Sequence, residues 1–434
     1  MSGNVAARPA RHRIWGRAVE AGRTLFSFEA AFLAYVFAGN YKGAAALADF
    51  PIDITLMWFC VSVILGAIIV AKRWPLPSGA IKLALVGVVF CLFAVASLLW
   101  SPSVIYGRQK AMYVATLSLG AFLGTALVIG PERERVKRLA TLLAGAGLVL
   151  ALVVFVAHWR AGFSDSGRYL GLPGDSILRG RLVGFGTVVL AAVLLCWDLR
   201  WPRRLMCGVV LLFMAFVLMD IGSRGPILGA ALAALLVVVL GFKSQVVGAL
   251  RSRWGLAALG CSIGLAVVGL FVYREVFGIV PYGVTRLLML PLQFTTTKAY
   301  SRATFFRQSL QLWTDRPLFG NGIGSFPVLL DWGDRKVHPH NIVLEVMAEL
   351  GTVGLALYLW LVSRAFRAFA PVKRLLSEPL LMLVFMLAVY AMFNSLVNGD
   401  LHENRMLFMA LGLCSYGAAS MGQSEHDPQS QEAT

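Results

Sequence analysis

The chain has 434 residues, of which 58% are hydrophobic and only 14% are charged, and its net charge is +17. Soluble domains carry about 25% charged residues, so this composition excludes an ordinary soluble protein. The basic residues lie mostly in short connections between apolar runs, which indicates membrane topology rather than a nucleic-acid partner. No pattern typical of a nucleic-acid-binding module accompanies them.

Apolar runs of about 20 residues, the length that crosses a bilayer as a helix, recur along the whole chain. We therefore predict an all-α polytopic membrane protein with twelve transmembrane helices. In chain order, the predicted spans are residues 25–41, 52–71, 80–100, 112–129, 136–156, 182–197, 205–220, 226–242, 254–273, 342–362, 380–397 and 406–421. The remaining parts are an N-terminal segment of residues 1–24, a long loop of residues 274–341 and a polar tail of residues 422–434.

The distribution of lysine and arginine predicts the orientation of these spans. Basic residues are concentrated in alternate connections, near residues 72–82, 133–138, 200–204, 243–253 and 364–374. Such an excess marks cytoplasmic connections, so both termini are expected in the cytoplasm and the long loop on the outer side. The tail of residues 422–434 is polar and acidic, and we expect it to be disordered.

Two outer connections carry more arginine than the orientation rule predicts. They contain Arg160, Arg168, Arg179, Arg181, Arg274, Arg286, Arg302, Arg307, Arg316 and Arg335. The planar guanidinium group binds phosphate oxygens in pairs, which favours an anionic ligand such as a lipid-linked phosphate or pyrophosphate. The alternative is that these arginines contact anionic lipid headgroups or pair with the few outer carboxylates.

Arg224 stands apart from both loops, in Gly222-Ser223-Arg224-Gly225 between the seventh and eighth spans. A charge at the membrane boundary is costly and usually faces a cavity or a partner. We therefore predict a functional role for Arg224.

The long loop has recognisable parts. Residues 282–294 are expected to lie at the membrane surface, residues 301–314 to form an amphipathic helix, and residues 317–326 to form a glycine-rich turn. Without a strand before it and a helix after it, such a turn is a weak phosphate signal, and packing against a neighbouring helix is the favoured interpretation.

A histidine pair, His338 and His340, precedes Asn341 and the tenth span. Histidine is the usual general base near neutral pH. A helix cap or a metal pair are the alternatives, but two histidines without a nearby cysteine make a poor zinc site. Glu345 and Glu349 share one face of the following helix, where they orient a histidine, face a cavity or pair with an arginine.

Several of these motifs together resemble the O-antigen ligase and O-antigen polymerase superfamily. They are Ser223-Arg224-Gly225, Ser301-Arg302, Pro317-Leu318-Phe319-Gly320-Asn321-Gly322-Ile323-Gly324, His338-Pro339-His340-Asn341 and Glu349-Leu350-Gly351-Thr352-Val353-Gly354. The resemblance covers roughly residues 180–365. It implies a GT-C-type glycosyltransferase of the bacterial inner membrane, with a periplasmic active site and with no metal or other cofactor. The implied donor is a glycan on undecaprenyl pyrophosphate, the implied acceptor is the lipid A–core, and membrane lipids surround the chain.

The resemblance also implies roles for individual residues. His338, His340 and Arg224 are the expected catalytic residues. The expected ligands of pyrophosphate and glycan are Arg302, Arg307, Arg168, Arg181, Arg286, Asn341 and Glu349. Around Arg168 the sequence departs from the family, since relatives often carry Arg-Leu-x-Gly where this chain has Gly167-Arg168-Tyr169-Leu170-Gly171.

The favoured hypothesis is an inverting ligase in which arginines hold the pyrophosphate and a histidine accepts the proton of the acceptor hydroxyl. His338 is favoured over His340 because it lies in the freer part of the loop. A polymerase, which would use a second lipid-linked glycan as acceptor, and a protein glycosylating ligase remain alternatives. The presence of one large outer loop rather than two favours the ligase. A transporter is disfavoured, because its charges would be expected near the membrane midplane.

Overall fold

The computed structural model describes residues 24–44, 50–161, 175–241 and 297–424, together with the isolated positions 22, 47, 243, 247 and 248. Helices and their connections make up these ranges, and no strand occurs within them. Several predictions lie outside the described residues. They concern Arg168, Arg286, the ninth span (254–273), the surface segment (282–294) and most of both tails.

The first half of the chain forms α2 (Phe28–Val36), η1 (Ala38–Asn40), α3 (Ile54–Lys72), α4 (Ser78–Ala96), η3 (Ser97–Trp100), α5 (Tyr106–Tyr113), η4 (Val114–Ser118), α6 (Leu119–Leu123), η5 (Gly124–Ile129), α7 (Arg133–Ala161), α8 (Ser176–Cys196), α9 (Trp201–Ile221) and α10 (Arg224–Leu240). The second half forms α15 (Thr297–Asp315), α16 (Ser325–Leu329), α17 (Ile342–Arg367), α18 (Val372–Ser377), α19 (Pro379–Asn398), α20 (Arg405–Leu413) and α21 (Ser415–Ser424). The segments α5, η4, α6 and η5 follow one another directly and act as one continuous helix.

Eight helices in the described ranges are long and apolar enough to cross a membrane, and each coincides with a predicted span. The predicted eighth and twelfth spans correspond to shorter apolar helices, Arg224–Leu240 and Arg405–Ala419. The first predicted span contains the nine-residue helix α2, which is too short to cross a bilayer alone. The all-helical, multi-pass character predicted from hydropathy is therefore confirmed.

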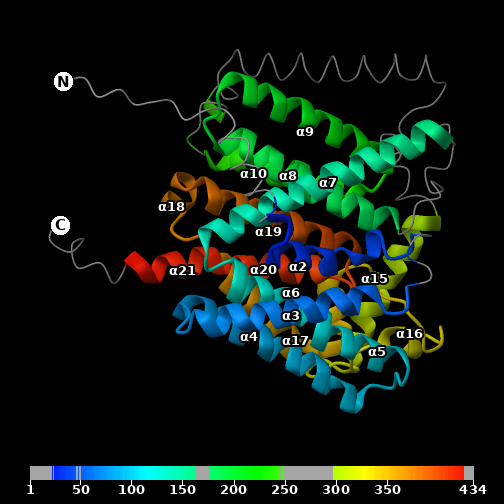
Figure 1. Ribbon diagram of the computed structural model, residues 1–434. Helices are drawn as coiled ribbons and strands as arrows, with labels where there is room; N and C mark the ends of the chain where they lie inside the picture. The colour runs from blue at the N-terminus through cyan, green and yellow to red at the C-terminus, as the bar shows by residue number, and fades with distance from the viewer. Residues whose placement is uncertain are drawn as a thin grey trace, which may run out of the picture.

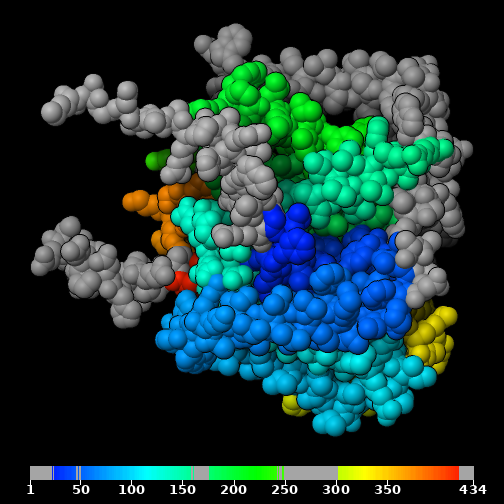
Figure 2. All heavy atoms as spheres, viewed as in Figure 1, coloured from blue at the N-terminus to red at the C-terminus, as the bar shows by residue number. Residues whose placement is uncertain are grey.

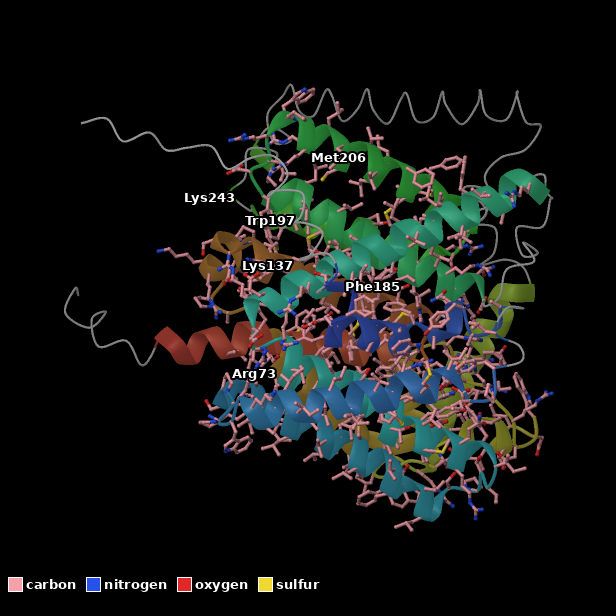
Figure 3. All side chains as sticks on the ribbon, in the orientation of Figure 1. Arg73, Lys137, Phe185, Trp197, Met206 and Lys243 are labelled. Atoms are coloured by element: carbon pink, nitrogen blue, oxygen red, sulfur yellow. The ribbon has the colours of Figure 1, made fainter. Side chains whose placement is uncertain are left out.

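Consecutive long helices run in opposite directions, so their connections gather at two ends of the bundle (Figure 1). We call the end that carries α15, α16 and residues 330–341 the loop end, and the other end the opposite end. Arg73 and Glu132 form an ion pair at the opposite end. The basic residues Arg73 and Lys137 lie toward that same end in Figure 3. The basic connections that the sequence groups together thus lie on one side of the bundle.

The interior of the bundle is formed by α8 and α19, whose apolar windows are mostly buried, whereas α3 and α9 are mostly exposed. In the face shown in Figure 2, α2 and α3 lie over this interior. Exposed apolar side chains of α3, such as Ile64 and Ile68, are stable where lipid tails replace water. Small residues allow the inner helices to approach closely: Gly229 of α10 lies against Asn394 of α19.

The glycine turn of residues 317–324 packs into a kink in α17. Gly351 interrupts the helix with a left-handed backbone (φ 68°). The backbone N–H of Thr352 donates to the carbonyl oxygen of Pro317 at 2.7 Å, and the N–H of Gly322 donates to the carbonyl oxygen of Glu349 at 2.7 Å. The turn therefore replaces hydrogen bonds that the kink removes from the helix. The predicted packing of this turn against a neighbouring helix is confirmed.

Gly322 tests how tightly the turn packs on its other side, against Ser101 directly after η3. Its φ of +90° is strained for any other residue, and an added Cβ would lie 2.5 Å from the Cα of Ser101. We expect Gly322→Ala to destabilise the folded protein by about 1–3 kcal/mol, measured as a lower midpoint of thermal unfolding in detergent. The control is Gly145→Ala in α7, where an added Cβ meets nothing within 4 Å. Equal midpoints for the two variants would contradict the tight packing.

Candidate functional site

The histidine pair lies at the loop end, between α15 and the last turn of α19. The ring centroids of His338 and His340 are 4.4 Å apart, and the ring of Phe305 from α15 lies 6.1 Å from that of His340. His340 adopts a left-handed backbone (φ 59°), which costs about 1–2 kcal/mol for a residue with a side chain. This turn of the chain leads from the loop into α17.

Asp334 fixes the histidine-bearing loop to the start of α5. Its carboxylate accepts hydrogen bonds from the backbone N–H groups of Val104, Ile105 and Tyr106 at 2.6–3.0 Å, and from the Ser103 hydroxyl at 2.6 Å. Burial acts to raise the pKa of Asp334, but these hydrogen bonds outweigh it and hold the pKa below its usual value. The carboxylate thus supplies partners for N–H groups that a helix start leaves unsatisfied.

His340 is held by the side chain of Asn398, at the end of α19. The distance from Nδ1 to Oδ1 of Asn398 is 2.7 Å. An amide oxygen only accepts hydrogen bonds, so with this assignment Nδ1 carries the proton and Nε2 keeps a lone pair. Burial lowers the pKa of His340, the Asn398 hydrogen bond opposes that effect, and the charge of Arg302 lowers the pKa further. The imidazole is therefore neutral at physiological pH.

His338 pairs with the carboxylate of Asp400, in the connection between α19 and α20. Nδ1 of His338 lies 3.3 Å from Oδ2 of Asp400, and the histidine side chain is 13% exposed. Burial lowers the pKa of His338 to about 4, although Asp400 acts in the other direction. The other oxygen of Asp400 lies 2.9 Å from Nδ1 of His402, and the Tyr106 hydroxyl donates to Oδ2 at 3.0 Å. Nδ1 of His338 meets no hydrogen-bond geometry within the structure, so its interaction with Asp400 is electrostatic, and a shift of the ring would form the hydrogen bond that orients a general base.

A buried charge network lies beneath this pair. The Nζ of Lys110 in α5 is an ion-pair partner of Glu345, lies 2.8 Å from Oε2 of Glu349, and is 3.7 Å from Oδ1 of Asp400. All four side chains are at most 1% exposed. The backbone N–H of Leu401 also donates to Glu345 at 3.1 Å. Asp400 therefore connects the network inside the bundle to His338 at its surface.

Three of the predicted arginines lie on α8, α10 and α15. Arg181, in the first turns of α8, is buried, and its Nη2 donates to the backbone carbonyl of Asn398. Arg224 begins α10 directly after Ser223, and a Cβ at Gly180 would lie 2.9 Å from the Cβ of Ser223. The first turn of α8 and the start of α10 are thus in contact.

The charge of Arg302, on α15, acts on His340 and lowers its pKa. Separately, Arg302 and Phe305 are three residues apart on α15, so they share a helix face. Phe305 contacts the His340 ring. Arg181 thus contacts Asn398, the partner of His340, Arg302 lies on the helix whose Phe305 contacts His340, and Arg224 begins the helix that contacts α8 next to Arg181.

Other predicted site residues have partners that hold the structure together. Asn341 is the N-cap of α17: its Oδ1 accepts from the backbone N–H groups of the helix, and its Nδ2 donates to the carbonyl oxygen of Leu396 at 3.0 Å. Glu349 belongs to the Lys110 network. Arg307 is exposed on α15, five residues beyond Arg302 and thus on a different side of the helix.

Sequence reasoning missed Lys110, Asn398, Asp400 and His402 as members of the site. A lysine at the edge of an apolar run indicates a buried partner, since such a charge is costly unless it is paired. In the sequence analysis Lys110 served only as evidence for the orientation of the spans. Asp400 and His402 lie in a short connection that resembles any other loop in the sequence. Their closeness to His338 depends on how α17 and α19 pack.

The arrangement combines a neutral histidine paired with a carboxylate, which can accept a proton, and three arginines, which can hold an anion. Within the described ranges, no group of three or more histidine, cysteine, aspartate or glutamate side chains is placed to hold a metal ion.

Comparison with known families gives one match, for residues 209–359, to the family described as O-antigen ligase. The matched range contains Arg224, Arg302, both histidines and Glu349. It confirms the resemblance to the O-antigen ligase and polymerase superfamily. No curated protein matches the chain.

Proposed function

Because residues 209–359 match the family described as O-antigen ligase, we propose that this membrane protein is a GT-C-type glycosyltransferase. It transfers a glycan from undecaprenyl pyrophosphate to the lipid A–core. The observation that carries the proposal is the His338–Asp400 pair, with 3.3 Å between nitrogen and oxygen; arginines on the helices around it support the proposal. A proton acceptor and a site for a charged leaving group are the two requirements of this reaction.

In the proposed mechanism, Arg181, Arg224 and Arg302 bind the pyrophosphate of the donor. Arginine matches phosphate oxygens with paired hydrogen bonds, and its fixed charge stabilises the pyrophosphate as it leaves. Arg307, Arg168 and Arg286 are proposed to contact the glycan or the pyrophosphate from the surrounding loops. The arginines thus act on the bond that breaks, between the anomeric carbon and the phosphate oxygen.

The acceptor hydroxyl attacks the anomeric carbon from the face opposite the pyrophosphate, so the configuration at that carbon inverts. His338 takes the hydroxyl proton, and Asp400 stabilises the imidazolium that forms. His340 lies 4.4 Å from His338, centroid to centroid, and is proposed to position the reacting groups. The step requires no metal ion or other cofactor.

The proposed orientation places the loop end in the periplasm of a bacterial inner membrane and both termini in the cytoplasm. Its support is the concentration of basic residues in the connections at the opposite end, which marks the cytoplasmic side. The proposed topology has twelve spans and a periplasmic loop that includes residues 297–341.

The pH dependence of the transfer tests the assignment of the base. A general base must be deprotonated, and the lowered pKa of His338, about 4, keeps it deprotonated at all pH values above that. We expect kcat/KM to stay level from about pH 8 to about pH 5 and to fall toward pH 4. A fall centred near pH 6.5, the ordinary value for histidine, would contradict the burial of the base.

The function itself is tested by deleting the gene and examining lipopolysaccharide and lipid-linked glycans. If the protein is the ligase, the deletion strain should contain free lipid A–core together with accumulated long glycan on undecaprenyl pyrophosphate. Supplying the intact gene should restore normal lipopolysaccharide. Loss of chain length with single units still attached would instead identify a polymerase. A normal lipopolysaccharide with an altered glycoprotein pattern would identify a protein glycosylating ligase.

A further inference from the structure

A polar cavity of about 470 Å³ lies at the loop end, on the His402 side of Asp400. Three cationic side chains from three separate segments line it: Lys42, Lys336 and Arg405. Two carboxylates, Asp53 and Glu403, also line it and pair with the two lysines. With three cationic side chains and two carboxylates, the lining has an excess of positive charge.

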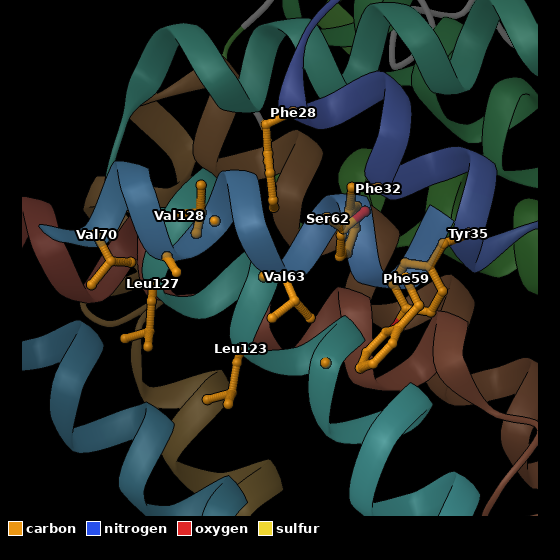
Figure 4. A pocket seen from close by; sticks show the side chains of 14 residues that line it. Phe28, Phe32, Tyr35, Phe59, Ser62, Val63, Val70, Leu123, Leu127 and Val128 are labelled. Atoms are coloured by element: carbon orange, nitrogen blue, oxygen red, sulfur yellow. The ribbon is translucent and has the colours of Figure 1, made fainter. Parts of the chain in front are cut away.

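An apolar cavity of about 240 Å³ lies between α2, α3 and the helix formed by α6 and η5 (Figure 4). Phe59 of α3 lines both cavities. From Thr55 to Val70, the lining residues of α3 recur every three or four positions, which places them along one face of the helix. The two cavities therefore lie next to each other along α3, on either side of Phe59: a charged chamber toward the loop end and an apolar groove within the bundle. We call the two together the α3 path.

Two glycines shape this groove. A Cβ at Gly120 would lie 2.6 Å from the ring of Phe59, and one at Gly124 would lie 2.6 Å from the ring of Phe32. The absence of side chains there allows the two rings to lie flat against the helix and form the wall of the groove. On the outer side, Val63 is 50% exposed, so the groove opens toward the surrounding lipid.

We propose that the α3 path binds the acceptor glycolipid, with its phosphorylated saccharide in the polar cavity and one acyl chain in the groove between α3 and the α5–η5 helix. The inference rests on the proposed function. A chamber with an excess of positive charge, next to an apolar groove that opens beside Val63, matches an amphiphile with an anionic head. The proposed function assigns Arg181, Arg224 and Arg302 to the donor, so the acceptor requires a second approach.

The position of Asp400 supports this assignment. His338 contacts one of its carboxylate oxygens, and His402, which lines the polar cavity, contacts the other. The ring of Tyr113 stacks on His402 with centroids 5.5 Å apart and also lines the cavity. A saccharide in the chamber would therefore lie beside the residues that hold the proposed base.

The test is binding of lipid A–core by the full chain in nanodiscs of phosphatidylethanolamine and phosphatidylglycerol that contain a minor fraction of lipid A–core. Bound lipids are identified by native mass spectrometry without any donor present. We expect Val63→Trp, which fills the groove, to reduce bound lipid A–core several-fold. The matched control is Ile64→Trp, since Ile64 is the next residue, is 60% exposed and does not line the groove. Both variants should keep the same thermal midpoint.

A second pair of variants tests the head chamber. Lys42→Glu should weaken lipid A–core binding, whereas Lys82→Glu, an exposed residue beyond the opposite end of the groove, should not. Equal binding by Val63→Trp and Ile64→Trp, or no preference for lipid A–core over the two phospholipids, would overturn the inference. The binding assay contains no donor, so it measures acceptor binding independently of glycan transfer. If the protein binds lipid A–core but transfers no glycan in a separate assay with donor, the proposed function is refuted and the groove is not. If the protein transfers glycan but the Val63→Trp variant binds lipid A–core as well as the unchanged protein does, the groove is refuted and the proposed function is not.

Discussion

Replacing His338 by alanine should lower the rate of glycan transfer by about 10²–10⁴-fold, the usual contribution of a general base. The physical reason is that the acceptor hydroxyl would lose its proton acceptor while the arginines still hold the donor. The measurement is kcat and KM for transfer by purified protein in nanodiscs. We expect kcat to fall and the KM for the donor to change little.

Two further variants separate the roles of the neighbouring groups. Asp400→Asn leaves His338 without its carboxylate, so it should also lower kcat, and His340→Ala should retain more activity than His338→Ala. The control is Arg335→Ala, which removes an exposed side chain of the same loop and should leave the rate unchanged. Full activity in both histidine variants would show that neither is the base.

Replacing Lys110 by methionine should destabilise the protein by about 3–5 kcal/mol, because it leaves Glu345, Glu349 and Asp400 buried without their shared ammonium group. The expected result is a strongly lowered yield and a lower midpoint of thermal unfolding in detergent. Removing the lysine and its carboxylate charges together avoids this cost, since replacing a whole buried ion pair often leaves the free energy of unfolding unchanged. Lys110→Met combined with Glu345→Gln and Glu349→Gln should therefore recover part of the lost stability.

The matched control is Lys137→Met at the start of α7. Lys137 pairs with Glu134 at 2.6 Å, but its side chain is 47% exposed, and exposed pairs contribute about 0–1 kcal/mol. If the two lysine variants unfold at the same temperature, the buried network does not hold the fold together.

Hydropathy predicted most of the architecture because a bilayer requires long apolar helices, and span lengths follow from its thickness. The predicted spans corresponding to α3, α7 and α19 agree closely with the structure. The first span is different, since the helix α2 covers only Phe28–Val36 within it. The kink at Gly351 was also not predicted, because a glycine within an apolar run does not reveal which turn will pack against it.

The candidate site was predictable in part. Arginines and histidines in polar loops are visible in the sequence, and their chemistry points to an anion and a proton. Their partners are not visible in the same way. The contact of Lys110 with Glu345 joins residues 235 positions apart, and the role of Asp400 depends on the packing of α17 and α19. Such contacts follow from tertiary structure, which composition and spacing do not specify.

The carboxylate of Asp334 accepts hydrogen bonds from the backbone N–H groups at the start of α5, yet Asp334 follows Tyr106 in the chain by 228 positions. A ribosome therefore delivers α5 to the membrane long before the group that completes its first turn has been made. Lys110, four residues further along, likewise enters without Glu345, Glu349 or Asp400. The order of synthesis thus makes the histidine site one of the last parts to assemble, and a truncated or half-inserted chain would hold Arg181, a proposed donor ligand, without the proposed proton acceptor.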